Sequence, residues 1–267
     1  MPVLSFIACR IFENEIVYLI KNDPAIDEVI VVDNEDSKKL QGKLDDVDCS
    51  YKVLPVDKLP QKSEHEGGKF ALIVDLLEFA LDASPEKLKK GVYEEIETMS
   101  KYADGVLVFY GLCGNVMGQV ESDFKNHPCY VGILKDEKGE VMDDCIAASL
   151  GSREMYLDAI MGCKGEGIYF LTPMQATYWK DMLKIARITP DPDDIEMTKY
   201  VFDYSGYKKV AKVDTGLDYD RDFEERVGEF SRLFDLDVVE MKGDLGLIER
   251  CYKNAKSRIN APGSDLM

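Results

Sequence analysis

Residues 106–115 read Val-Leu-Val-Phe-Tyr-Gly-Leu-Cys-Gly-Asn, and this stretch decides the predicted fold. Five apolar or aromatic residues in succession, closed by a glycine, predict a buried strand that ends in a tight turn. Cys113 then lies at the carboxyl end of the strand, which is where open α/β sheets bind their ligands. We therefore expect a central strand that brings a thiol to a binding site.

Strand-like and helix-like segments alternate along most of the chain, which is typical of a parallel sheet covered by helices. Eight segments are predicted as strands, and they are residues 3–8, 28–33, 51–56, 106–110, 130–134, 168–171, 208–214 and 237–241. Helices are predicted between them, including residues 70–83 and 85–102. The predicted fold class is α/β, with three α/β/α layers, a mostly parallel sheet and Rossmann-like repeats of strand and helix.

One proline- and aspartate-rich segment, residues 189–194, indicates a division into two lobes. Residues 1–188 would then form an α/β domain that holds the binding site, and residues 189–267 a C-terminal α/β lobe. The same segment could equally be an ordinary loop within one continuous domain, and both interpretations stay open.

Composition excludes several classes of protein. The net charge is −18, from 51 acidic and 33 basic residues, and nucleic-acid binding needs clustered positive charge instead. No apolar run approaches the roughly 20 residues of a membrane span, and the first residues lack the basic region of a signal peptide. We therefore expect a cytoplasmic protein that binds neither nucleic acid nor membrane.

The cysteines suggest metal or thiol chemistry. There are seven, an odd number, so a disulfide framework is not expected in a cytoplasmic chain. Only His65 and His127 could add imidazole, so a metal site would depend on thiolates and carboxylates. His65 lies in a polar loop, where we expect it to be solvated.

Three of the cysteines have related positions. Cys9 ends the apolar run 3–8, Cys113 follows the strand described above, and Cys145 begins a predicted helix. A helix N-terminus favours the thiolate, and three thiolates leave one coordination position open, as in a 4Fe-4S cluster or a catalytic zinc site. The alternative is that these cysteines are small hydrophobic core residues.

Other residues near these thiols are candidates for the same site. Asp144 could be a ligand or general base, or simply a helix cap. Arg10 could hold an anionic substrate, or form a surface salt bridge. Gly111, Gly114 and Asn115 are predicted to bind the cofactor, since glycine lets the backbone approach a bound group closely.

A further cysteine, Cys163, is a candidate fourth ligand in the segment Met-Gly-Cys-Lys-Gly. Its spacing from the other three gives no recognised metal motif, so structural and ligand roles both stay open.

Four short motifs, at residues 7–9, 110–114, 144–146 and 167–173, resemble the domain-of-unknown-function 1638 family over about residues 3–255. The resemblance implies that Cys9, Cys113 and Cys145 are recurring motif positions. The family occurs in anaerobic bacteria and in methanogenic archaea, often beside genes for corrinoid-dependent methyl transfer. This chain has Asp144 where a histidine is frequent in the family, which would alter or remove a ligand there.

These observations together predict a metalloprotein, most simply an enzyme, with a three-thiolate centre. We expect a 4Fe-4S cluster with an open iron, with Zn²⁺ as the alternative. The first implies lyase or desulfidase chemistry and the second implies thiol methyl transfer. The resemblance adds a link to anaerobic C1 and corrinoid metabolism. The expected partners are a small-molecule substrate and a corrinoid protein, a homo-oligomer stays open, and the alternative function is a non-catalytic accessory protein.

Overall fold

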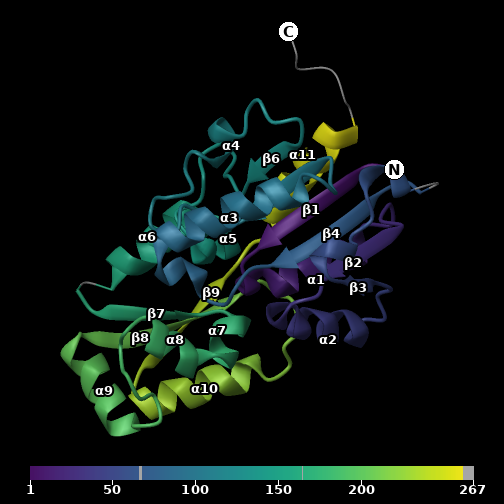
Figure 1. Cartoon of the computed structure of the whole chain (residues 1–267). Coiled ribbons are helices and arrows are strands. Elements are labelled where there is room, and N and C mark those ends of the chain that lie inside the picture. Colours follow the sequence, from purple (N-terminus) through teal and green to yellow (C-terminus); the bar gives the residue numbers. More distant parts are fainter. Residues whose placement is uncertain (66–67, 164, 261–267) are drawn as a thin grey trace. The chain divides into compact units, whose positions relative to one another are not determined.

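The computed structural model describes residues 1–65, 68–163 and 165–260, and the chain divides into two compact units (Figure 1). The first unit consists of Met1–Cys145 and Gly246–Met267, and the second of Ile146–Leu245. The lobe boundary predicted between residues 188 and 189 falls within the second unit.

A six-stranded parallel sheet forms the first unit, with strand order β3-β2-β4-β1-β5-β6. The strands are β1 (Val3–Ala8), β2 (Glu28–Val32), β3 (Lys52–Leu54), β4 (Ala71–Leu76), β5 (Gly105–Phe109) and β6 (Tyr130–Ile133). The helices are α1 (Glu13–Asn22), α2 (Lys38–Asp46), α3 (Pro85–Met99), α4 (Val120–Asp123) and α11 (Gly246–Asn260), and α5 (Cys145–Leu150) begins at the last residue of the segment Met1–Cys145 and continues into the second unit. Short 3₁₀ helices occupy Arg10–Phe12, Glu35–Ser37, Val56–Lys58, Lys62–Glu64 and Leu81–Ala83.

Helices cover both faces of this sheet. The connection through α1 and the connection through α3 run in opposite directions along the sheet, and right-handed crossovers therefore place them on opposite faces (Figure 1). Helix α11 lies beside α1, since Tyr18 donates a hydrogen bond of 2.6 Å to Glu249. The predicted three-layer α/β fold with a parallel sheet is confirmed.

The order of the strands creates a topological switch point at the carboxyl edge. The chain leaves β1 towards β2 on one side, and it leaves β5 towards β6 on the other. Ligand sites of open α/β sheets lie where neighbouring strands diverge in this way. The segments after β1 and β5, which hold Cys9 and Cys113, both begin there.

Strand β5 is interior but not central. It is buried along its whole length and pairs with β1 and β6, so it stands one strand in from the edge. The prediction that this strand is central is therefore corrected. An apolar run indicates that a strand is buried, but it does not indicate where in the sheet the strand lies.

The prediction of a helix over residues 70–83 is wrong. Residues Ala71–Leu76 form β4, every residue of which is buried, between β1 and β2. A continuous apolar run has no period that separates a buried strand from a buried helix. The next predicted helix, residues 85–102, is confirmed as α3, which begins at Pro85.

The second unit has a three-stranded parallel sheet in the order β7-β8-β9. The strands are β7 (Gly167–Leu171), β8 (Tyr207–Asp214) and β9 (Asp237–Lys242). The helices are α6 (Arg153–Gly162), α7 (Pro173–Thr177), α8 (Trp179–Ile185), α9 (Ile195–Tyr204) and α10 (Phe223–Phe234).

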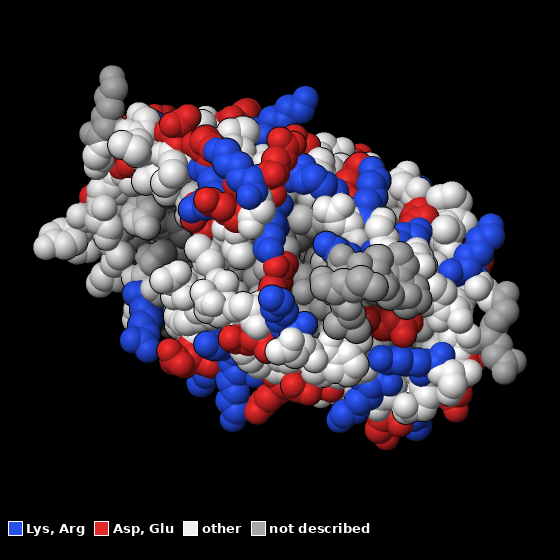
Figure 2. All heavy atoms as spheres, turned by 90° about the horizontal axis from the view of Figure 1, so that it is seen from above, with Lys and Arg blue, Asp and Glu red and all other residues white. Residues whose placement is uncertain are grey.

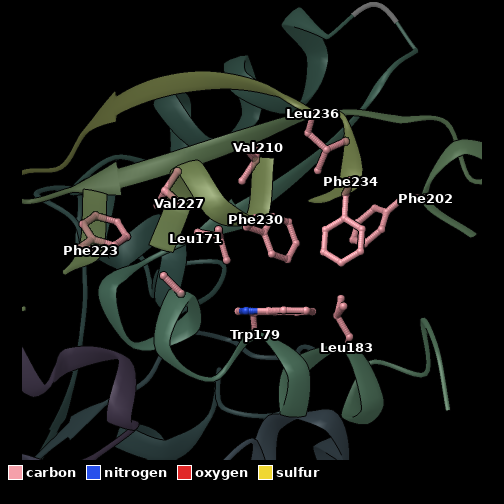
Figure 3. Close-up of a cluster of buried hydrophobic side chains, with 11 residues drawn as sticks. Leu171, Trp179, Leu183, Phe202, Val210, Phe223, Val227, Phe230, Phe234 and Leu236 are labelled. Carbon is pink, nitrogen blue, oxygen red and sulfur yellow. The ribbon is translucent and has the colours of Figure 1, made fainter. Parts of the chain in front are cut away.

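An aromatic cluster forms one side of the second unit's core (Figure 3). Phe230 lies among Trp179, Phe202 and Phe234, with ring centroids 4.8–5.9 Å apart. A smaller cluster around Phe170 packs separately from it.

The surface is charged with both signs. Acidic and basic side chains are interspersed over the face shown in Figure 2. Among the described residues, no helix is both long enough and apolar enough to cross a membrane.

Candidate metal centre

The structure brings Cys113 and Cys145 together. Their sulfur atoms are 3.8 Å apart, and the two residues are only 6% and 7% exposed. The backbone fixes this approach, because the Leu112 amide donates to the Met142 carbonyl at 2.7 Å and the Cys113 amide donates to the Asp143 carbonyl at 3.2 Å. Two segments about 30 residues apart thus run side by side immediately before their cysteines.

Gly111 allows the two segments to approach this closely. A Cβ atom at this position would lie 2.6 Å from the Met142 carbonyl oxygen and 2.7 Å from the Asp144 Cα. A Cβ at Gly114 would likewise lie 2.7 Å from Pro85 Cγ. Gly111 therefore makes room for the backbone that positions the thiols, and Gly114 makes room for the Pro85 ring, whereas the contact of either glycine with a cofactor stays a prediction.

The turn after Leu112 has an unusual backbone. Cys113, Gly114 and Asn115 have φ values of 42°, 80° and 63°, so three successive residues are left-handed. This conformation is strained for a cysteine and costs of the order of 1 kcal/mol. Strain of this kind concentrates at functional sites, because elsewhere nothing selects for it.

Cys9 completes the group. Its amide donates to the Phe109 carbonyl at 3.3 Å, which extends the pairing of β1 and β5 by one residue. Hydrogen bonds with Cys113 and Cys9, together with burial, raise the pKa of the Cys145 thiol well above its ordinary value. All three thiols also lie near the fully buried Tyr110, whose pKa is raised by burial and by their charges. The three predicted thiols therefore converge.

The spacing of the buried pair matches one bound ion. Two thiolates at about 2.3 Å from a tetrahedral ion are about 3.8 Å apart, which is the separation of Cys113 and Cys145. A 4Fe-4S cluster binds each thiolate through a different iron, and so needs a wider separation. As the side chains stand, however, the described residues contain no set of three His, Cys, Asp or Glu groups that could hold a metal ion. Cys113 and Cys145 have the spacing of two ligands of one ion. Cys9 lies near them, but its side chain does not complete a set of three ligands.

Comparison with known proteins identifies the family. Residues 76–252 match the family model described as a protein of unknown function (DUF1638). The chain belongs to the DUF1638 family. The match includes Cys113 and Cys145 and begins after Cys9, so it is shorter than the expected range of residues 3–255. Neither the curated proteins nor the solved structures gave a match to this DUF1638 protein.

Arg10 of the DUF1638 protein lies in a buried network of charges. Its Nε donates to Glu13 Oε1 at 3.0 Å, and its Nη1 lies 3.5 Å from Asp36 Oδ1. Lys43 Nζ lies 3.1 Å from the other oxygen of Glu13. Arg10 is thus not a surface residue. A substrate anion would have to bind a guanidinium group that already contacts Glu13 and Asp36.

The remaining candidate residues differ from one another in their surroundings. Asp144 lies with its backbone against Gly111. Cys163 belongs to the second unit, where its thiol donates to the Ala159 carbonyl at 3.0 Å. The prediction that His65 is solvated is wrong, because its ring is buried and Nδ1 is 2.8 Å from Glu28 Oε2.

A carboxyl pair with one buried member was missed by the sequence analysis. Asp75, near the end of β4, hydrogen-bonds Glu95 of α3, and Asn34 donates to Asp75 Oδ1 at 3.0 Å. Burial, followed by the charge and hydrogen bond of Glu95, raises the pKa of Asp75 well above its ordinary value. The only sequence signal was one aspartate within the apolar run of residues 70–77.

We expect Asp75→Asn to stabilise the protein at neutral and alkaline pH. Because the folded-state pKa is raised, the folded protein holds a proton that the unfolded chain releases above pH ~4. The unfolding free energy therefore falls as pH rises through the window up to the folded pKa, at about 1.4 kcal/mol for each unit of difference. Asparagine can keep both hydrogen bonds without ionising.

Urea unfolding at pH 5 and pH 8 measures this effect. The variant should gain at least about 1 kcal/mol at pH 8 relative to its change at pH 5. Asp57→Asn, at an exposed position, is the matched control and should leave the pH dependence unchanged. Equal pH dependence in Asp75→Asn and the unmodified protein would show that Asp75 ionises normally.

Proposed function

We propose that this DUF1638 protein is a cytosolic metalloenzyme whose metal centre is bound by Cys9, Cys113 and Cys145. The observation that supports this most directly is the 3.8 Å separation of the two buried sulfurs, which equals the spacing of two thiolates on one tetrahedral ion. The strained backbone at Cys113 supports it further, since the strain serves to hold that thiol beside Cys145.

The same distance favours a single zinc ion over the 4Fe-4S cluster that the sequence led us to expect. Cys9, Cys113 and Cys145 would hold the zinc, and the bound ion would supply an open fourth position and Lewis acidity that lowers the pKa of a substrate thiol. This chemistry agrees with the link to corrinoid-dependent methyl transfer that the family resemblance implied. We therefore propose a small thiol as the substrate class.

The residues of the proposed site would have different roles. Cys113 and Cys145 are held by paired backbone segments and by burial, so they form the fixed part of the site. Cys9 is less buried than the other two, and a rotation of its side chain would complete the ligand set. Tyr110 is fully buried near the three thiols and would help to exclude water from them.

Metal and acid-labile sulfide analysis of anaerobically purified protein tests the proposal. We expect about one zinc per chain, lost in Cys113→Ser and in Cys145→Ser, and bound at least tenfold more weakly in Cys9→Ser. Cys49→Ser is the control and should keep its zinc, since Cys49 lies in a different part of the first unit.

Other outcomes would change the proposal. About four iron and four sulfide per chain, lost in the same variants, would establish the cluster instead and point to lyase or desulfidase chemistry. Zinc that is bound weakly and passes to a corrinoid protein would support the accessory function. No metal in any form of the protein would overturn the three-thiolate centre.

A further inference from the structure

The sulfur pair at the candidate centre also has the geometry for another reaction. None of the seven cysteines, all of which belong to the described residues, forms a disulfide, and Cys113 Sγ lies 3.8 Å from Cys145 Sγ. A disulfide needs about 2.05 Å, so the sulfurs must approach by roughly 1.8 Å, a distance that small side-chain rotations supply. We propose that Cys113 and Cys145 are an oxidative modification site, and form a reversible disulfide when the metal-free protein meets a peroxide.

The backbone favours this pair. The two amide–carbonyl hydrogen bonds between residues 112–113 and 142–143 hold the segments together in either redox state, so bond formation needs no rearrangement of the chain. Three of the other thiols bond backbone carbonyls instead. Cys129 donates to Ala103, Cys163 to Ala159 and Cys251 to Lys135.

The reaction balances with peroxide as the oxidant. One thiol attacks hydrogen peroxide, which gives a sulfenic acid and one water. The second sulfur attacks the sulfenic sulfur, so that the S–S bond forms as the S–O bond breaks, and a second water leaves. The two thiols lose two protons and two electrons in total, and the peroxide is reduced to two waters.

The disulfide would control the metal centre. It consumes two of the three proposed ligands, so oxidised protein cannot bind the ion, and bound ion would protect both sulfurs from peroxide. This consequence rests on the proposed function, whereas formation of the disulfide does not.

The test uses full-length protein, reduced, stripped of metal with a chelator and treated with one equivalent of hydrogen peroxide. We expect the intact mass to fall by two hydrogens and the alkylatable thiols to fall by two from seven. Trypsin cleaves at Lys125 between the two cysteines, so a non-reduced digest should contain linked peptides that include Cys113 and Cys145. Dithiothreitol should reverse all three changes.

Variants establish the pairing. Cys113→Ser and Cys145→Ser should abolish the two-thiol loss, and Cys49→Ser should preserve it. A disulfide that joins Cys9 to Cys145, or oxidation of single thiols without a cross-link, would overturn the assignment.

A parallel sample loaded with zinc before oxidation separates this inference from the proposed function. Protection by zinc supports both. A disulfide that forms equally with and without zinc, in protein that binds none, would overturn the metal centre and leave the disulfide standing. Bound zinc with no disulfide after chelation and oxidation would overturn the disulfide alone.

Discussion

Gly111→Ala is expected to destabilise the protein and to separate the two buried thiols. The added Cβ would lie 2.6–2.8 Å from backbone atoms of Met142 and Asp144, and backbone cannot move aside as a flexible side chain can. Overpacking of this kind costs about 1–3 kcal/mol, and the displaced segments would lengthen the hydrogen bond between Leu112 and Met142. We expect a loss of that size in urea unfolding, together with at least tenfold weaker zinc binding.

Gly42→Ala is the matched control for this substitution. Gly42 lies within α2 and has no atom within 4 Å of an added Cβ. Alanine has the higher helix propensity, so this variant should gain about 0.5–1 kcal/mol and bind metal normally. A Gly111→Ala protein that is as stable as the unmodified chain, and that still forms the Cys113–Cys145 disulfide, would show that the two segments tolerate a wider separation.

Phe230→Ala should have the largest effect on stability. The side chain is fully buried in the aromatic cluster of the second unit, where the ring centroid of Phe234 lies 4.8 Å away (Figure 3). Tyr169 also stacks on it, at a centroid distance of 5.3 Å. Removing a buried phenylalanine leaves a cavity and costs about 3–5 kcal/mol. The single tryptophan, Trp179, contacts the same ring at 5.5 Å, so its fluorescence reports unfolding of this unit directly.

An exposed aromatic residue of the same unit provides the comparison. Tyr204 in α9 is 83% exposed, although it stacks on Tyr200. Tyr204→Ala should change the unfolding free energy by no more than about 0.5 kcal/mol. Similar losses in Phe230→Ala and Tyr204→Ala would mean that the cluster does not stabilise the second unit as described.

Local sequence patterns were sufficient for most of the fold. Eight strands were predicted where strands occur, because runs such as residues 3–8 and 106–110 combine apolar, β-branched and aromatic residues with abrupt polar ends. The ninth, β4, was read as part of a helix because the leucines after Ile73 and Val74 extend the apolar run beyond a strand's length. The spacing of apolar residues cannot distinguish a strand from a helix when every residue is buried.

The sequence also led to the prediction that three thiols would meet. Cys9 and Cys113 follow parallel strands, and the carboxyl ends of such strands share one edge of the sheet, so these two thiols were expected at the same edge. The tertiary structure alone decided the 3.8 Å spacing of Cys113 and Cys145, the burial of Arg10 and the pairing of Asp75 with Glu95. The physical reason is that local patterns encode burial and period, whereas the sulfur pair and the carboxyl pair join residues 20 or more positions apart, whose distance depends on how whole segments pack.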